Sequence, residues 1–153
     1  MKYVEVKMVV EEQLEKYLSQ GYDQSQAETH ILEVATAMFR EEKIGFMDLK
    51  YFFQILGYEF PDGLRQTMED IKKAICLDYG LLDIIRSEMK SGKTRQEAVE
   101  VVIRSAYESF QNGGIEEPEL LDMVLWALGY RLSDGFFEMS PEQMKKKLLY
   151  EKD

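Results

Sequence analysis

A ten-residue stretch that occurs twice constrains the fold of this chain more than any other feature of its sequence. Residues 55–64 read Ile-Leu-Gly-Tyr-Glu-Phe-Pro-Asp-Gly-Leu, and residues 127–136 read Ala-Leu-Gly-Tyr-Arg-Leu-Ser-Asp-Gly-Phe, with five of the ten positions identical. Each stretch follows an apolar run with helical spacing and precedes another, a pattern typical of a helix end and a tight turn. The repeated stretch is therefore predicted to be architectural, with Gly57 and Gly129 each ending a helix.

The sequence around the repeated stretch also recurs. Residues 27–39 align with residues 98–110, and residues 49–56 align with residues 121–128. Core, turn and cap residues agree between the aligned segments, whereas surface charges differ. This pattern predicts an internal duplication, in which each half is too small to cover its own apolar face and packs on the other as a pseudo-twofold pair.

Apolar residues recur at spacings of three and four along most of the chain, which predicts an all-α fold of seven or eight helices. Capping boxes are expected at Asp23, Thr94 and Ser140, each followed three residues later by Gln or Glu. Residues 2–7 alternate between apolar and polar, so a strand or a helix is open there. The expected organisation is one compact domain over residues 1–153, with half 1 at about 3–68, half 2 at about 75–140 and a short last helix at 141–150.

Composition places the chain among folded globular proteins. It has 153 residues, of which 45% are hydrophobic and 12% aromatic, enough to bury a core. No apolar run is long enough for a membrane span, and Glu5 interrupts the place where a signal peptide needs apolar residues. The single Cys76 excludes an internal disulfide. We expect a cytoplasmic protein with no membrane partner.

The formal net charge of −10, from 29 acidic and 19 basic residues, bounds the choice of partner. An acidic surface repels phosphate backbones, so direct binding of nucleic acid is disfavoured. The same charge serves solubility, or it faces a protein partner with a basic surface, such as a nucleic-acid-binding protein. The one basic cluster of this chain is residues 145–147.

No group of residues has the spacing of a catalytic, metal or cofactor site. His30 is the only histidine, so paired Glu-x-x-His metal ligands are impossible. The alternating Asp series of a calcium loop is absent, and Gly113-Gly114 lacks the Lys that follows the glycines of a phosphate-binding loop. Cys76 lies in an apolar run and is predicted to be a core residue. We therefore predict no catalytic residue, no metal and no cofactor.

Two sets of residues are candidates for contact with a partner. The first set consists of carboxylates on or near the loops where the halves differ: Glu41, Glu42, Glu116, Glu117 and Glu119. The second set consists of aromatic residues outside the main apolar stripe of their helices, Tyr51 and Trp126. Surplus aromatics mark a partner surface or a second buried face between the halves, and both interpretations are open.

The function that fits these observations is that of a non-enzymatic, acidic helical protein that binds another macromolecule. A narrower hypothesis is an inhibitor that occupies the basic nucleic-acid-binding surface of a partner protein, as small acidic anti-defence proteins of phages and plasmids do. Two alternatives are open: a regulatory or structural homodimer with an aromatic interface around Trp126, and an enzyme whose site is not recognised.

Overall fold

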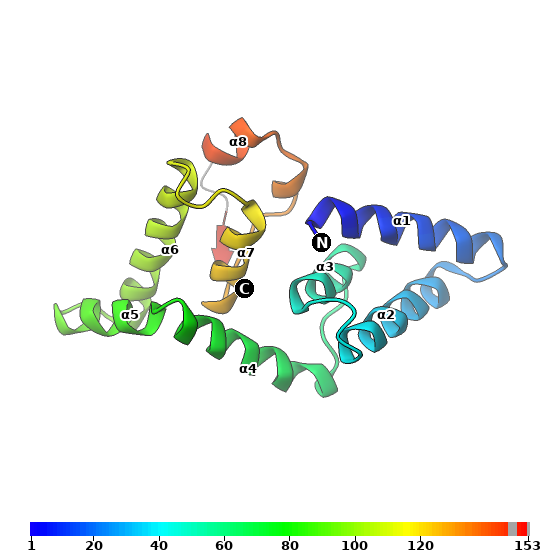
Figure 1. The fold of residues 1–153 in the computed structure, drawn as a ribbon, viewed down its shortest axis with the longest axis horizontal. Coiled ribbons are helices and arrows are strands. Elements are labelled where there is room, and N and C mark those ends of the chain that lie inside the picture. The colour runs from blue at the N-terminus through cyan, green and yellow to red at the C-terminus, as the bar shows by residue number, and fades with distance from the viewer. Residues whose placement is uncertain (147–149, 153) are drawn as a thin grey trace. The chain divides into compact units, whose positions relative to one another are not determined.

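A computed structural model of the chain describes residues 1–146 and 150–152. In this part, the chain forms eight α-helices, one short 3-10 helix (η1) and a two-stranded hairpin (Figure 1). The elements in chain order are α1 Tyr3–Ser19, α2 Gln24–Arg40, α3 Phe46–Leu56, α4 Asp62–Asp78, α5 Leu81–Lys90, α6 Arg95–Gln111, α7 Pro118–Ala127, β1 Tyr130–Leu132, η1 Phe136–Glu138, α8 Pro141–Lys146 and β2 Tyr150–Lys152. The chain divides into two compact units, unit 1 at Met1–Arg65 and unit 2 at Gln66–Asp153.

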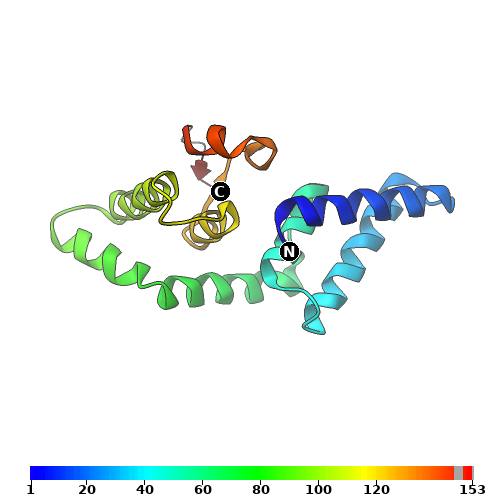
Figure 2. The ribbon, with the colours of Figure 1, turned by 45° about the horizontal axis from the view of Figure 1, so that its top comes forward.

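Unit 1 is built from the first three helices. Helix α1 packs against both α2 and α3, and α2 packs against α3 (Figure 2). Its core side chains come from the apolar stripes of these helices, among them Val6, Val10, Ile31 and Leu49. Because each helix buries one stripe against the other two, the 3.6-residue periodicity of the sequence accounts for this unit.

Unit 2 adds a C-terminal segment to its helices. Helix α6 packs against α5, α7 and α8, and β1 pairs with β2 in antiparallel register, Leu132 opposite Tyr150. The core joins Ile103 and Tyr107 of α6 to Leu125 of α7, and the C-terminal segment contributes Phe136 and Met144. Residues 130–152 therefore supply part of the core of unit 2.

Three predicted helix starts and two predicted helix ends are confirmed by hydrogen bonds and backbone angles. In each of the three capping boxes, the cap side chain accepts a hydrogen bond from the backbone N–H three residues on: Asp23 at 2.8 Å, Thr94 at 3.1 Å and Ser140 at 3.3 Å. Gly57 and Gly129 have φ of 79° and 84°, in the left-handed region that suits glycine at a helix end.

One open alternative is decided and two expectations are corrected. Between the strand and the helix left open at residues 2–7, the structure has a helix, since residues 3–7 belong to α1. The all-α prediction missed the hairpin of β1 and β2. The last helix, predicted over 141–150, covers Pro141–Lys146; residues 147–149 lie outside the described part, and Tyr150–Lys152 pair with β1 instead of extending the helix.

Over residues 1–146 and 150–152, no helix combines the length and the apolar character that crossing a membrane requires.

Candidate binding groove

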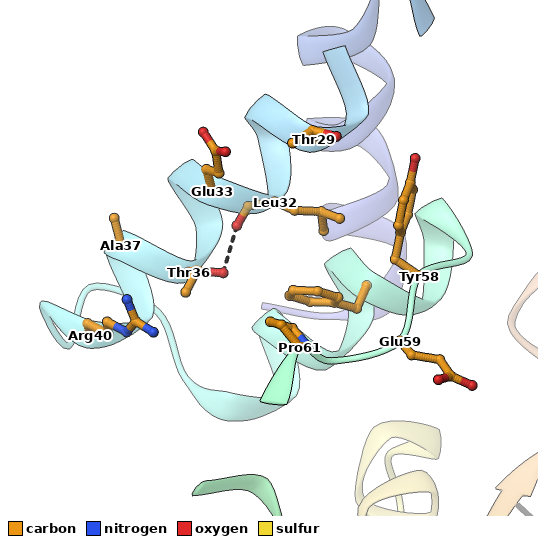
Figure 3. A pocket seen from close by; sticks show the side chains of 10 residues that line it. Thr29, Leu32, Glu33, Thr36, Ala37, Arg40, Tyr58, Glu59 and Pro61 are labelled. Atoms are coloured by element: carbon orange, nitrogen blue, oxygen red, sulfur yellow. Dashed lines mark hydrogen bonds between the residues drawn. The ribbon is translucent and has the colours of Figure 1, made fainter. Parts of the chain in front are cut away.

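Unit 1 has an open groove of about 580 Å³ beside α2 that could receive a ligand (Figure 3). We call it the α2 groove. It is lined by one face of α2, by Phe53 of α3 and by the loop between α3 and α4: Thr29, Leu32, Glu33, Thr36, Ala37, Arg40, Phe53, Tyr58, Glu59 and Pro61. A cavity of roughly 150 Å³ holds a benzene ring, so this groove has room for several side chains.

The floor of the groove is apolar. Leu32 and Phe53 are buried beneath it, and Figure 3 shows Leu32 pointing from α2 toward the loop that carries Tyr58 and Pro61. The Thr36 hydroxyl donates a hydrogen bond of 2.7 Å to the Leu32 carbonyl, within its own helix. This bond satisfies the hydroxyl locally, so that the methyl group of Thr36 can serve the apolar face.

The loop wall follows directly from the repeated Leu-Gly-Tyr stretch. Gly57 ends α3 in the left-handed conformation, and Tyr58 then turns beside α2 and donates a hydrogen bond of 3.1 Å from its hydroxyl to Glu28 Oε1. This bond to the Glu28 carboxylate raises the pKa of Tyr58, with smaller contributions from desolvation and the Glu28 charge. The loop is held further by the Phe60 ring, 4.8 Å from the Phe53 ring, and by Arg65, whose Nε donates to the Phe60 carbonyl at 3.0 Å.

Acidic side chains outnumber basic ones at the rim. Glu33 and Glu59 line the groove, and Glu28 stands beside it at Tyr58, against one Arg40. Glu59 also pairs with Arg65 at 3.3 Å, at the outer edge of the loop. The groove therefore offers an apolar floor with a net negative rim, which favours an apolar ligand that carries positive charge.

Helix α6 of unit 2 has the length of α2 but is covered along part of its surface. Both helices have 17 residues and start at a capping box, so each position of one has a position of the same number in the other. Leu32, Thr36 and Arg40 hold the ninth, thirteenth and seventeenth positions of α2; Ile103, Tyr107 and Gln111 hold them in α6. The Tyr107 hydroxyl donates to the Met144 carbonyl at 2.6 Å, and Gln111 Nε2 donates to the Lys145 carbonyl at 2.7 Å. The segment that carries α8 therefore lies where unit 1 has its groove.

The carboxylates predicted from the sequence lie on two loops, one in each unit. Glu41 and Glu42 follow α2 and are exposed; Glu41 pairs with Lys43 at 2.9 Å, and Glu42 has a φ of 60°. Glu116 and Glu117 are exposed before α7, and Glu119 lies half-buried in its first turn. The structure brings each set together on its own loop, and none of the five lines the α2 groove.

The two predicted aromatic residues are buried. The Tyr51 ring meets the Tyr3 ring edge to face at 5.2 Å in unit 1. The Trp126 ring of unit 2 lies under the Lys72 ammonium, at 5.1 Å from Nζ to the ring centroid. Both rings therefore have contacts inside their own units, and Lys72 lies over the Trp126 face as a cation–π partner.

The residues with potential chemistry have packing contacts. The His30 ring meets the Tyr17 ring at 4.7 Å and the Tyr22 ring at 6.0 Å. Cys76 is buried and its thiol faces the Ala127 carbonyl at 3.4 Å; burial raises the pKa of the thiol and disfavours the nucleophilic thiolate. Across the described residues, no three His, Cys, Asp or Glu side chains gather as a metal site would need.

Sequence reasoning missed the lining of the α2 groove. Leu32 and Thr36 read as ordinary members of a helical stripe, and a helix face left uncovered has no motif of its own. One indication was present: the second half carries residues beyond its Leu-Gly-Tyr stretch, up to the helix predicted at 141–150, for which the first half has no counterpart.

No protein-family model, curated protein or solved structure matches this chain. The groove and the charge of the chain are therefore the grounds for a function.

Proposed function

We propose that this chain is a non-enzymatic protein that binds another protein through the α2 groove. The observation that carries the proposal is the groove itself: about 580 Å³ of open, largely apolar space on a helix face whose counterpart in unit 2 is covered. Its volume lies within the range of roughly 300–1,000 Å³ found for ligand sites. Exposed Tyr58 adds an aromatic side chain of the kind that contributes most to protein interfaces.

The charge of the chain narrows the partner to a basic protein. A net charge of −10 accelerates association with a positive surface and repels competing acidic ones. The narrower form of the proposal is that the chain inhibits a nucleic-acid-binding protein by covering its basic surface. In this form, the exposed carboxylates Glu41, Glu42, Glu116 and Glu117 contribute to steering.

The test is quantitative capture from the native host with tagged full-length chain, comparing two variants that carry the same substitution. Ala37→Tyr fills the groove, whereas Ala74→Tyr places the same ring on an exposed site of α4 that is not part of the groove lining. We expect a specific protein to be retained by the parent and by Ala74→Tyr, and lost with Ala37→Tyr. Equal retention by all three chains would contradict the groove as the binding site.

Salt separates the electrostatic part of the proposal from the apolar part. Raising the salt concentration from about 0.05 M to about 0.5 M shortens the Debye length severalfold, so binding to a basic partner should weaken. For the inhibitor form, the purified partner should release a labelled oligonucleotide as the chain is added. Binding that does not change with salt, or a ternary complex with the oligonucleotide, would contradict this form.

A homodimer is the second candidate, and exposed apolar side chains in unit 2 favour it. Leu77 is 70% exposed and Tyr79 51% exposed where α4 ends, and Ile84 of α5 is also exposed. Such side chains cost free energy in water and gain it in an interface. Light scattering at micromolar concentration decides this: a monomer excludes a stable dimer, whereas a dimer that Leu77→Asp converts to monomer supports it.

We also propose that the two units descend from one duplicated unit. The support lies in matched positions: α2 and α6 begin 71 residues apart (24 and 95), and the two glycines at helix ends stand 72 apart (57 and 129). An experimental structure should superpose α1–α3 on α5–α7 with the same pairing. A best superposition with a different residue offset would exclude the duplication.

A further inference from the structure

We propose that the occupant of the α2 groove is a short amphipathic helix of the partner protein, with one buried apolar anchor and adjacent lysines, seated as α8 is seated on α6. This inference rests on the proposed function, because it names the chemistry of the ligand of the same site. It follows from comparing the same helix face in the two units, one open and one covered.

The covered face shows what such a surface accepts. Met144 of α8 is buried in the core of unit 2, its carbonyl receives the Tyr107 hydroxyl, and Gln111 binds the next carbonyl, of Lys145. The contact thus combines one apolar anchor with two hydrogen bonds from α6 to the end of the docked segment. Helix-in-groove recognition in proteins uses the same combination of apolar anchors and polar edges.

The open face retains the elements of this contact and lacks the segment that covers it. Leu32 supplies the apolar floor at the position of Ile103, and Arg40 supplies a donor at the position of Gln111. Thr36 replaces Tyr107 with a smaller side chain, which leaves space. Unit 1, which ends at Arg65, leads from the Tyr58–Pro61 loop directly into α4, whereas unit 2 leads from Tyr130 into β1, η1 and α8.

The two tyrosines that follow the glycines at the helix ends differ in exposure in the same way. Tyr58 and Tyr130 each follow a glycine that ends a helix, yet Tyr58 is 39% exposed and Tyr130 is 6% exposed. The Tyr130 ring contacts the Tyr150 ring of β2 at 6.1 Å. Tyr58 has the Glu28 carboxylate beside it and one face toward the groove, so an incoming segment would cover it as β2 covers Tyr130.

The negative charge at the rim of the α2 groove favours a docked helix with lysines next to its apolar anchor. In α8, Lys145 and Lys146 directly follow Met144 and are exposed. The rim of the α2 groove carries Glu33 and Glu59, with Glu28 behind Tyr58, against the single Arg40, so carboxylates outnumber guanidinium groups around a docked helix that carries lysines. The same geometry repels an acidic helix, which makes the choice of partner selective.

The probe is a fluorescein-labelled synthetic peptide with the sequence of residues 140–152, added to the full-length chain and followed by anisotropy. A second peptide replaces its methionine with aspartate, and a third replaces its three consecutive lysines with glutamates. We expect saturable binding of the first peptide and binding weaker by about tenfold or more for the other two. Ala37→Tyr and Glu33→Lys in the chain should weaken the first peptide to the same degree, whereas Ala74→Tyr and Glu12→Lys should not.

The variants also show where the peptide binds. Binding that survives Ala37→Tyr and Glu33→Lys would mean that the peptide displaces the chain's own α8 from unit 2, and it would overturn the inference. Binding that ignores the methionine or the lysines would overturn it as well, as would no binding or a second copy of the chain as the occupant in light scattering. Partner capture that is sensitive to Ala37→Tyr would still support the proposed function, so the two failures are distinguishable.

Discussion

Thr36 and Tyr107 hold the thirteenth positions of α2 and α6, one helix in each unit, yet their surroundings differ. Thr36 borders an open groove, whereas Tyr107 is 1% exposed and bonded to the Met144 carbonyl. The helices have the same length and the same kind of cap. The difference comes from the segment after the Gly-Tyr turn: α4 begins four residues after Tyr58, but the chain after Tyr130 folds back over α6. Whether a helix face is open or covered thus depends on residues outside the helix.

The largest expected effect comes from removing the cover of α6. Phe136 is buried against the Phe110 ring, at 6.3 Å between centroids, and Phe136→Ala should cost about 3–5 kcal/mol of unit 2 stability. Phe60→Ala in unit 1 should cost roughly 1–2 kcal/mol, because Phe60 is only half-buried. Hydrogen exchange read separately for each unit measures both. Equal losses would mean that the two segments cover their helices equally, and the comparison would fail.

The two turns should respond alike to substitution. Gly57→Val and Gly129→Val should each destabilise by about 2 kcal/mol, because a β-branched residue is strained at positive φ. Space is not the cause, since an added Cβ at either position meets no atom within 4 Å. Gly63→Val, in the first turn of α4, is the matched control and should cost far less. Parent-like melting of the Gly57 or Gly129 variant in urea would disprove the cap assignment.

A smaller effect is expected at the thirteenth helix position. Tyr107→Phe removes the hydrogen bond to the Met144 carbonyl and should cost about 1 kcal/mol, seen as faster amide exchange in α8. Thr36→Val removes a bond that stays within its helix and should change stability by no more than about 0.5 kcal/mol. If Thr36→Val lowered the free energy of unfolding as much as Tyr107→Phe does, the Thr36 hydroxyl would contribute to stability beyond its own helix, contrary to this prediction.

The smallest effect concerns pH and the capping boxes of α2 and α6. Hydrogen bonding to Thr94 lowers the pKa of Glu97 below its ordinary value of 4.5. Its contribution to stability is therefore complete above that value and is lost as the pH falls through the lowered pKa. Glu97→Gln should keep the cap and reduce the loss of urea resistance between about pH 6 and pH 3. Gln26→Glu in the box of unit 1 should introduce such a loss, and unchanged pH profiles in both variants would contradict the assignment.

Local patterns predicted local structure well. The boxes at Asp23, Thr94 and Ser140 and the turns at Gly57 and Gly129 depend on residues within three or four positions, and all five are confirmed. The periodic apolar stripes predicted the helices for the same reason: a helix face is encoded at spacings of three and four.

The hairpin and the groove depend on residues that are far apart in the sequence. Strand β1 is three residues long and pairs with Tyr150–Lys152, about twenty residues away, so no local periodicity of its own could indicate it. The α2 groove exists because unit 1 lacks a covering segment, and no residue of α2 encodes that absence. The carboxylates were predicted from their negative charge, and the aromatic residues from their positions outside the apolar stripe of their helices. Neither property indicates which face of a helix stays open.

The φ of 60° at Glu42 has a consequence for protein engineering. The equivalent loop of unit 2 places Gly113 at φ 84°, the conformation that glycine adopts without strain. An L-residue with a side chain sacrifices on the order of 1 kcal/mol there, so Glu42→Gly is a rational thermostabilising substitution. It also deletes one of the exposed carboxylates proposed to steer association, which changes the net charge from −10 to −9. A library selected only for melting temperature would thus lose negative charge at this loop.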